Sequence, residues 1–596
     1  MHSIEYSFGA QLLAPDRARF RLWAPGRQQV SLEVEGRPPQ PMQAMPDGWF
    51  EAQADCGAGS RYRYRVSEDL AVPDPASRLQ AGDVHDASVV CDRDAYQWKR
   101  KDWTGRPWHE TVLYELHPGV LGGFDGVRRQ LPALAELGFT AIELMPIADF
   151  PGPRNWGYDG VLPYAPDTAY GTPEQLKELV DAAHELDMMV FLDVVYNHFG
   201  PDGNYLNAYA GDFFRDDLKT PWGQAIDFRR RQVRDYFIEN AIWWLDEYRF
   251  DGLRFDAVHA ISEKDFLAEM AQRVREAFPP GRRIHLVLEN DDNSAALLAR
   301  EPQPLYDAQW NDDMHHVLHV MLTGEHEGYY AGYTNQTAER LARGLTEGFV
   351  YQGDASLYPG GEPRGEPSGH LPPTSFVLFL QNHDQIGNRA LGERLTSLAD
   401  PDALRAAAAL MLLAPHVPMV FMGEEIGATT PFLYFTSHLT EELADAVRKG
   451  RREEFARFPA FSAPETREKI PDPNAQATFD ASIPVADPVV AASWRDWYKS
   501  VIAIRHAQIV PRLAGARALD AAVLGPRAVK ARWTMGDGAV LMIAVNLGAA
   551  AVPVSYEGLA DGRGGTILFE TRDATGASLD GELPARSIIV LLEPGS

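Results

Sequence analysis

The spacing of apolar and polar residues changes twice along the chain, and the changes divide it into three parts. Up to about residue 95, short segments alternate apolar and polar side chains at a period of two, with clusters of Gly and Pro between them. This pattern predicts strands with one buried face, as in a β-sandwich. The same pattern returns from about residue 511. The segments are 19–25, 30–34 and 61–66 in the first part and 528–533, 540–545 and 587–592 in the last.

The middle part alternates apolar runs of strand length with longer stretches of helical spacing. Continuous apolar strands followed by helices predict a parallel sheet that is buried on both faces, and eight of them predict a (β/α)8 TIM barrel. The runs are 112–116, 141–145, 190–194, 252–256, 284–289, 306–310, 376–380 and 418–422. We therefore expect a multidomain protein with an N-terminal β-sandwich (1–95), a central barrel (96–510) and a C-terminal β-sandwich (511–596).

Local signals add detail to the predicted barrel. Thr172, Pro173 and Gln175 form the sequence signature of a capped helix start, followed by an apolar stripe that ends at Leu186. Two connections after strand ends, 199–226 and 322–372, are unusually long and rich in Gly. Long loops on this side of a barrel usually serve function. We expect both to form walls of the active site.

Charge and cysteine content restrict the possible partners. The formal net charge is −28, which repels nucleic acid and anionic membranes and favours a neutral substrate. The two cysteines, Cys56 and Cys91, have no metal-type spacing, and although they could pair, they form no disulfide framework. The sequence shows no signal-peptide pattern and no run of about 20 apolar residues. We expect a cytoplasmic protein.

Polar residues gather at the ends of the predicted strands. A buried, unpaired acid costs several kcal/mol, so some of these acids are candidates for structural pairs, for example with Arg254. As a set on one rim, however, they favour catalysis. They are Asp193, Arg254, Asp256, Glu289, His383 and Asp384.

Two of these acids fit the chemistry of glycoside hydrolysis. A retaining glycosidase needs a carboxylate that attacks the anomeric carbon and a carboxylic acid about 5–5.5 Å away that protonates the leaving oxygen. Asp256 and Glu289 end neighbouring strands. Arg254 lies two residues before Asp256, on the same face of its strand, where its charge would keep Asp256 ionised. Glu289 would need a raised pKa.

Four motifs resemble the signature regions of the α-amylase family, in the same order. They are Asp193-Val-Val-Tyr-Asn-His198, Gly252-Leu-Arg-Phe-Asp256, Glu289 after an apolar strand, and Asn382-His-Asp384. The resemblance implies Asp256 as nucleophile, Glu289 as acid/base and Asp384 as transition-state stabiliser. It implies that Tyr158, His198, Arg254 and His383 line the sugar subsite at the scissile bond, and that 199–226 is a small inserted domain. We add Trp156, Asp291 and Asp312 as candidate substrate-binding residues. Core packing is the alternative for Trp156 and Tyr158.

Further segments are similar to those of the maltooligosyltrehalose trehalohydrolases within that family. They are 309–316, 324–333, 381–389, 421–425 and 431–435. This resemblance implies cleavage of the α-1,4 bond next to the terminal trehalose of maltooligosyl trehalose, and a carbohydrate-binding-module-like N-terminal sandwich. The loop 117–124 is several residues shorter than is usual there. Alternatives are a branching enzyme or another transglycosylase of the family, acting on a related α-glucan, and a non-catalytic glucan-binding protein.

We expect neither a metal nor a cofactor. His315 and His316 are adjacent, so their side chains point in different directions and form no ligand pair. Relatives that bind calcium use an asparagine at the position of Asn197 together with acids of the inserted domain, which is short here. We therefore expect Asn197 to be a structural hydrogen-bonding residue. The sequence gives no indication of the oligomeric state.

Overall fold

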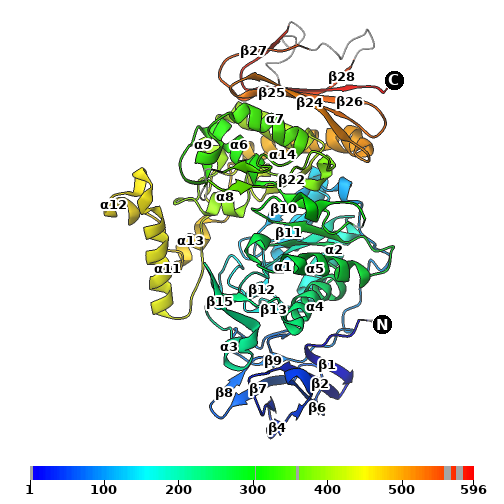
Figure 1. Cartoon of the computed structure of the whole chain (residues 1–596), viewed down its shortest axis with the longest axis vertical. Helices are drawn as coiled ribbons and strands as arrows, with labels where there is room; N and C mark the ends of the chain where they lie inside the picture. Colours follow the sequence, from blue (N-terminus) through cyan, green and yellow to red (C-terminus); the bar gives the residue numbers. More distant parts are fainter. Residues whose placement is uncertain (1–3, 303, 357–360, 556–564, 572–580, 596) are drawn as a thin grey trace.

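The computed structural model describes residues 4–302, 304–356, 361–555, 565–571 and 581–595. The molecule is elongated, with a barrel in the middle and a set of sheets at either end (Figure 1). Among the described residues, no helix is long and apolar enough to cross a membrane. Cys56 and Cys91 are both free thiols.

Eight parallel strands close into the central barrel, in the order in which they occur in the chain. They correspond to the eight apolar runs, so the predicted (β/α)8 barrel is confirmed. The strands are β10 (Leu113–Leu116), β11 (Ala141–Leu144), β14 (Met189–Val194), β17 (Gly252–Phe255), β18 (His285–Leu288), β19 (Ala308–Trp310), β22 (Phe376–Leu378) and β23 (Val417–Phe421).

Helices cover the outside of the barrel (Figure 1). The main ones are α1 (Gly123–Leu137), α2 (Pro173–Glu185), α4 (Arg231–Glu247), α5 (Lys264–Glu276), α6 (Asp312–Thr323), α7 (Thr337–Glu347) and α10 (Pro401–Leu413). The capping box predicted for α2 is present, with Thr172 and Gln175 bonded reciprocally. Leu186 departs from the predicted stripe, because it is the C-cap of α2 and is 38% exposed.

The barrel interior is apolar toward the amino ends of the strands and charged toward their carboxyl ends. Alternate residues of each strand face inward. Apolar inward residues from seven of the eight strands form one buried cluster, which includes Phe191, Val287, Trp310 and Phe379. Toward the carboxyl ends of the strands, the inward positions carry acids and Arg254, so the catalytic candidates lie next to this apolar cluster.

Two antiparallel sheets precede the barrel, as predicted. The first contains β1 (Gly9–Ala14), β2 (Arg17–Trp23), β6 (Trp49–Ala54) and β5 (Gln43–Ala44); the second contains β4 (Gln40–Pro41), β3 (Ser31–Val34), β7 (Arg61–Ser67), β8 (Leu70–Val72) and β9 (Ser88–Val89). Buried residues such as Phe20 and Tyr62 pack between the sheets, with their ring centroids 4.8 Å apart.

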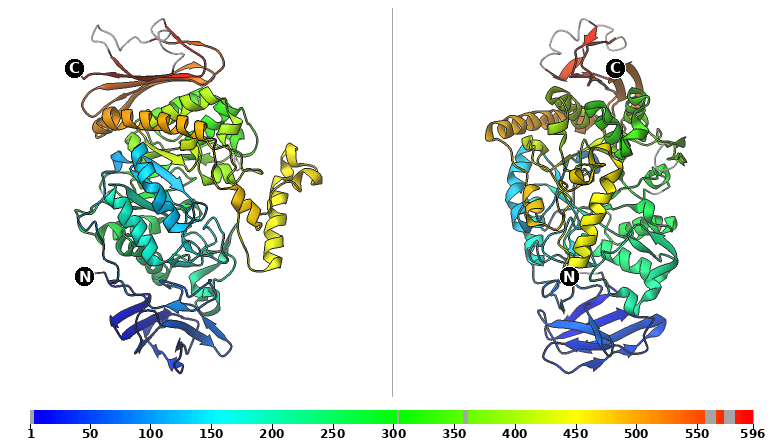
Figure 2. Two further views of the ribbon diagram at one scale, coloured as in Figure 1. Left: turned by 180° about the vertical axis from the view of Figure 1, so that it is seen from behind. Right: turned by 90° about the vertical axis from the view of Figure 1, so that its left-hand side faces the viewer.

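A five-stranded antiparallel sheet forms the other end of the molecule. It consists of β24 (Arg517–Gly525), β25 (Ala528–Thr534), β26 (Val540–Asn546), β30 (Ser587–Glu593) and β28 (Thr566–Glu570), and β27 (Val552–Pro553) pairs with β29 (Glu582–Leu583). The long helix α14 (Pro488–Ile504) lies between this sheet and the barrel (Figure 2). These strands contain the three C-terminal segments predicted from the sequence.

Three additions interrupt the barrel pattern. Segment 199–226 holds α3 (Leu206–Tyr209), a short 3-10 turn (Gly211–Phe213) and a hairpin of β15 (Phe214–Thr220) and β16 (Gly223–Ile226). Segment 322–372 includes a 3-10 helix (Gly328–Tyr333), α7 and a hairpin of β20 (Asp354–Ala355) and β21 (Pro363–Arg364). After β23, the helices α11 (Glu441–Glu454) and α12 (Pro464–Arg467) project to one side, and α13 (Gln476–Ala481) returns toward the barrel (Figure 1).

Candidate active site

The structure brings the strand-end residues together at the carboxyl end of the barrel. Asp193 and Arg254 lie on the adjacent strands β14 and β17 and are partners in register. Asp256 directly follows β17, and Glu289 directly follows β18. His383 and Asp384 begin the short helix α8 (His383–Gly387), which follows β22.

A buried guanidinium group links three of the acids. Arg254 is 0% exposed, and its Nη1 lies 2.7 Å from both Asp193 Oδ2 and Asp256 Oδ1. Its Nη2 lies 3.5 Å from Glu289 Oε2, and the ring of Trp310 packs under the group at 4.2 Å. Burial acts to lower the pKa of Arg254, but the surrounding acids raise it well above its usual value. One permanently charged side chain therefore holds Asp256 and Glu289 beside each other.

Glu289 has the environment of a carboxylic acid that keeps its proton. Its side chain is 16% exposed, and burial raises its pKa, against Arg254 but together with the charges of Asp256 and Asp384. Its Oε2 accepts a hydrogen bond from the backbone N–H of Ala257. Ala257 adopts a left-handed conformation with φ 41°, which aims this N–H at the acid.

His383 forms a second charged centre beside the first. Its Nδ1 bonds Glu115, a buried residue of β10, and its Nε2 lies 2.7 Å from the hydroxyl of Tyr158. Burial acts to lower the pKa of His383, but Asp384 and Glu115 raise it to about 9. The imidazole is therefore positively charged at neutral pH. The carboxyl group of Asp384 is 42% exposed, 3.6 Å from His383 Nε2, and so is open to a ligand.

Tyr158 and Trp156 are neighbours with different surroundings. The Tyr158 hydroxyl donates to Asp193 Oδ2 at 2.6 Å, and its ring stacks on His383. Trp156 is only 3% exposed; it stacks on Phe432 and donates to the carbonyl oxygen of Leu433. This buried position differs from the direct substrate contact expected for Trp156. Core packing, the alternative for this residue, describes it better.

His198 carries one wall of the site. Its Nε2 lies 3.0 Å from the carbonyl oxygen of Tyr158, and its Nδ1 lies 2.9 Å from Asn197 Oδ1, so both neighbours orient the imidazole ring. Trp222, at the tip of the β15–β16 hairpin, stacks on His198 at 4.9 Å and is 47% exposed. The sequence analysis did not single out Trp222, although an exposed Trp inside an oversized Gly-rich insertion was the available signal.

Segment 322–372 also reaches the site. Arg364 of β21 lies 3.1 Å from Asp291, two residues after Glu289, and 2.6 Å from the buried Asp313. Asp312 lies beside Asp313 at the start of α6 and accepts a hydrogen bond from Gln385 at 3.2 Å. Its pKa is raised well above the usual range by burial and by the neighbouring Glu289, Asp291 and Asp384. Both long insertions thus reach the rim that carries Asp256 and Glu289.

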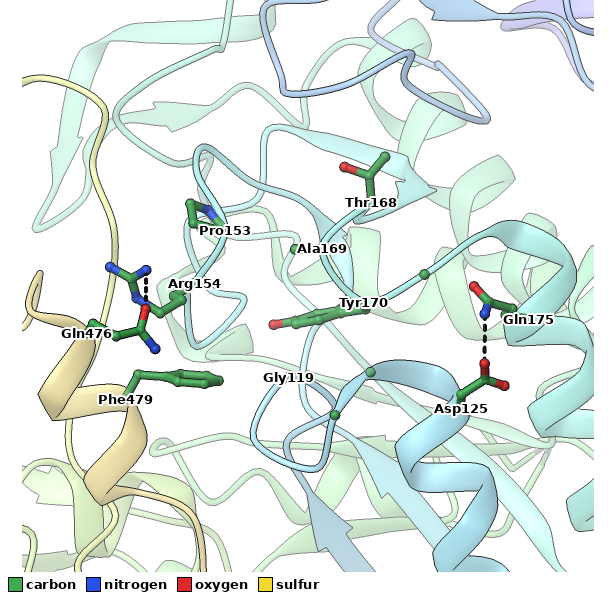
Figure 3. A pocket seen from close by; sticks show the side chains of 13 residues that line it. Gly119, Asp125, Pro153, Arg154, Thr168, Ala169, Tyr170, Gln175, Gln476 and Phe479 are labelled. Carbon is green, nitrogen blue, oxygen red and sulfur yellow. Dashed lines mark hydrogen bonds between the residues drawn. The ribbon is translucent and has the colours of Figure 1, made fainter.

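A separate pocket of about 430 Å³ lies off this centre, between the loop after β10, the loop before α2 and helix α13. Tyr170, Phe479 and Gly119 are among the residues that line it (Figure 3). Four of its polar side chains form two pairs: Arg154 with Gln476 and Gln175 with Asp125, both at 2.8 Å. None of the catalytic candidates lines it.

The adjacent histidines are occupied with backbone contacts. His315 Nδ1 bonds the carbonyl oxygen of Leu380, and His316 Nδ1 bonds that of Asp312. Within the described ranges, no group of three or more His, Cys, Asp or Glu side chains is arranged to hold a metal ion.

Comparison with known proteins assigns the class that this fold and rim define. Residues 92–217 match the model of the alpha-amylase catalytic domain, and residues 516–590 match a domain of unknown function, DUF3459. A crystal structure described as a putative alpha-amylase from Salmonella typhimurium superimposes with a TM-score of 0.92 at 42% identity, covering 99% of this chain and 100% of that chain. The protein is a glycosidase of the α-amylase family.

Curated relatives narrow the assignment. The malto-oligosyltrehalose trehalohydrolase of Deinococcus radiodurans is 43% identical over 77% of this chain and 76% of its own length. That of Rhizobium sp. (strain M-11) is 37% identical over 96% and 97%. The chain belongs to the malto-oligosyltrehalose trehalohydrolase family, which favours the hydrolase over the branching-enzyme alternative.

Proposed function

We propose that the enzyme cleaves the α-1,4-glucosidic bond next to the terminal trehalose unit of maltooligosyl trehalose and releases trehalose, with retention of configuration. The relatives named above support the substrate. The observation that carries the mechanism is the arrangement around Arg254, which contacts both carboxyl groups that a retaining glycosidase needs.

In the first step Asp256 attacks the anomeric carbon while Glu289 protonates the leaving oxygen of the trehalose unit. The ion pair with Arg254 at 2.7 Å holds the Asp256 carboxyl group in position for attack. The raised pKa of Glu289 keeps its proton available. The result is a maltooligosyl ester on Asp256 and free trehalose.

In the second step water opens the ester, with Glu289 acting as base. Esterification removes the negative charge of Asp256, which is one of the charges that raise the pKa of Glu289. The pKa of Glu289 therefore falls when the intermediate forms, and the same group can now accept a proton. Asp384 and the cationic His383 would hold the sugar hydroxyls while charge develops on the ring. Tyr158, His198 and Asp291 complete the proposed sugar contacts, with Asp312 beside them.

Product analysis tests the substrate and the stereochemistry together. We expect free trehalose from maltooligosyl trehalose, much slower cleavage of a plain maltooligosaccharide of equal length, and a new reducing end that appears first as the α-anomer in proton NMR. Initial β-anomer would contradict the roles of Asp256 and Glu289. New branches, detected as a changed iodine stain of amylose, would contradict hydrolysis as the main reaction.

A further inference from the structure

The barrel interior contains an acid that the mechanism above does not use. Glu143 lies in β11, in register with Glu115 of β10 and Phe191 of β14. Phe191 and Ala141 belong to the interior cluster, so Glu143 also faces inward. It is 1% exposed, and among the described residues neither of its carboxyl oxygens has a hydrogen-bond partner.

A carboxylate in such a place is unfavourable. An ionised group without hydrogen bonds in an apolar surrounding usually takes up a proton instead. The charged groups that face Glu143 are Glu115 of β10, Asp193 of β14, Arg254 of β17 and His383 of α8. Each cation already has acids of its own: Arg254 pairs with Asp193 and Asp256, and His383 pairs with Glu115.

Asp193 has a buried acceptor atom that could receive a hydrogen bond from Glu143. Its Oδ2 accepts hydrogen bonds from Arg254 Nη1 at 2.7 Å and from the Tyr158 hydroxyl at 2.6 Å. Its Oδ1 is buried and has no partner among the described residues. Glu143 and Asp193 lie on the adjacent strands β11 and β14. The register partner of Glu143 is Phe191, and Asp193 lies two residues nearer the rim than Phe191.

We propose that Glu143 is a neutral carboxylic acid whose proton serves Asp193 Oδ1, and that it is thereby a positioning residue for the Asp193–Arg254–Asp256 chain. The proton belongs on Glu143 because Asp193 has a guanidinium and a hydroxyl to stabilise its charge, whereas Glu143 has neither. Burial raises the pKa of Glu143 well above its usual range; Asp193 and Glu115 add to this, while Arg254 and His383 oppose it.

Arg254 would transmit the effect of Glu143 to the nucleophile Asp256. If Asp193 is held at both oxygens, Arg254 Nη1 is fixed between Asp193 and Asp256, and the nucleophile keeps its orientation. This inference rests on the proposed function, because it concerns the same nucleophile. The protonation state of Glu143 is nevertheless measurable without any substrate.

The test compares Glu143→Gln, which keeps the shape and an N–H donor, with Glu143→Leu, which removes the donor. Infrared difference spectra at neutral pH should contain the C=O band of a protonated carboxyl group that disappears in Glu143→Gln. Glu143→Gln should keep kcat within about threefold, whereas Glu143→Leu should lose at least about tenfold in kcat with little change in KM. The exposed Glu68→Gln is the control, with parental band and rates.

Three results would overturn the proposal. Absence of the band would show that Glu143 is ionised. An equal loss of kcat in both variants would show that the carboxyl group itself is needed. Lower stability with unchanged kcat in both would reduce Glu143 to packing. If Glu143→Leu does not fold, the band and the rate of Glu143→Gln decide. Failure of the parent enzyme to release trehalose would count against the proposed function and leave the band as the test here.

Discussion

Replacing Glu289 by Gln tests the assigned chemistry most directly. The amide has nearly the same shape as the acid, and its oxygen can still accept the hydrogen bond from the Ala257 N–H. The Arg254 guanidinium, whose Nη2 lies 3.5 Å from Glu289 Oε2, loses only one of three acidic neighbours. The variant should therefore fold and bind substrate, but it cannot protonate the leaving oxygen.

The expected loss follows from general acid catalysis. This contribution is about 10²–10⁴-fold, which corresponds to roughly 3–5 kcal/mol of barrier. A substrate whose leaving group needs no proton separates the two steps. With α-maltosyl fluoride, the variant should form the ester on Asp256 at a rate near the parental one, but the ester should then persist, because no base activates water.

Two measurements follow the variant, with matched controls. Steady-state turnover of maltooligosyl trehalose should fall by the factor above, while mass spectrometry of the intact protein should detect the persistent ester with the fluoride. Azide, a nucleophile that needs no base, should open this ester, restore turnover of α-maltosyl fluoride and give the α-glycosyl azide. Glu276→Gln, an exposed change near the end of α5, should behave as the parent. Turnover of maltooligosyl trehalose within a few fold of the parent would remove Glu289 from its role.

Three further outcomes are expected. Activity requires protonated Glu289 and is lost as pH rises through the pKa of this acid. Because the charge of Asp384 helps to raise that pKa, Asp384→Asn should lower it and shift the alkaline limb of the residual kcat profile to lower pH. An unmoved limb would contradict the coupling. Trp222→Ala should raise KM by about fivefold, or about 1 kcal/mol, if its exposed ring contacts sugar; an unchanged KM would place the ring outside the substrate path. Asp251→Asn should lower the unfolding free energy by about 3 kcal/mol, because the buried carboxylate accepts bonds from Trp103 and His184, yet leave kcat unchanged; thermal unfolding and turnover measure the two effects.

The barrel could be predicted because each of its strands is a continuous apolar run. A strand that is buried on both faces has this signature, and eight of them in succession leave few other folds. The position of the rim residues could be predicted for the same reason, since Asp256 and Glu289 are the acids that end two of these runs. Their meeting point needed no further information, because parallel strands of a barrel all end on one side.

The partners of the rim residues could not be predicted in the same way. Glu115 and Glu143 are charges inside apolar runs, so each was read as part of its strand, although a buried acid is itself a signal of a pairing or of chemistry. Glu115 bonds His383, which lies 268 residues away in the chain, and no local pattern records that distance.

Trp156 shows the opposite limit. Its sequence context, a Gly- and Asn-rich loop at the rim, is the same as that of Tyr158, yet Trp156 is only 3% exposed, whereas the hydroxyl of Tyr158 bonds Asp193. Phe432 accounts for the difference in exposure. It follows the last barrel strand, β23, in the chain and stacks on Trp156 with the ring centroids 5.4 Å apart. Which of two neighbouring aromatic rings is open thus depends on packing between distant segments.

The N-terminal sheets are tied to the inserted segment that carries Trp222. Gly26 donates a backbone hydrogen bond to Tyr209, Arg27 bonds the carbonyl oxygen of Ala208, and the ring of Trp23 lies 6.1 Å from that of Phe213. The β15–β16 hairpin, whose tip reaches His198, starts immediately after Phe213. The N-terminal sheets therefore contact the segment whose hairpin reaches His198. An enzyme that lacks these sheets should keep Asp256 and Glu289 in place but lose the support of the inserted segment. We expect it to discriminate less well between substrates, even if the sheets themselves do not bind a glucan.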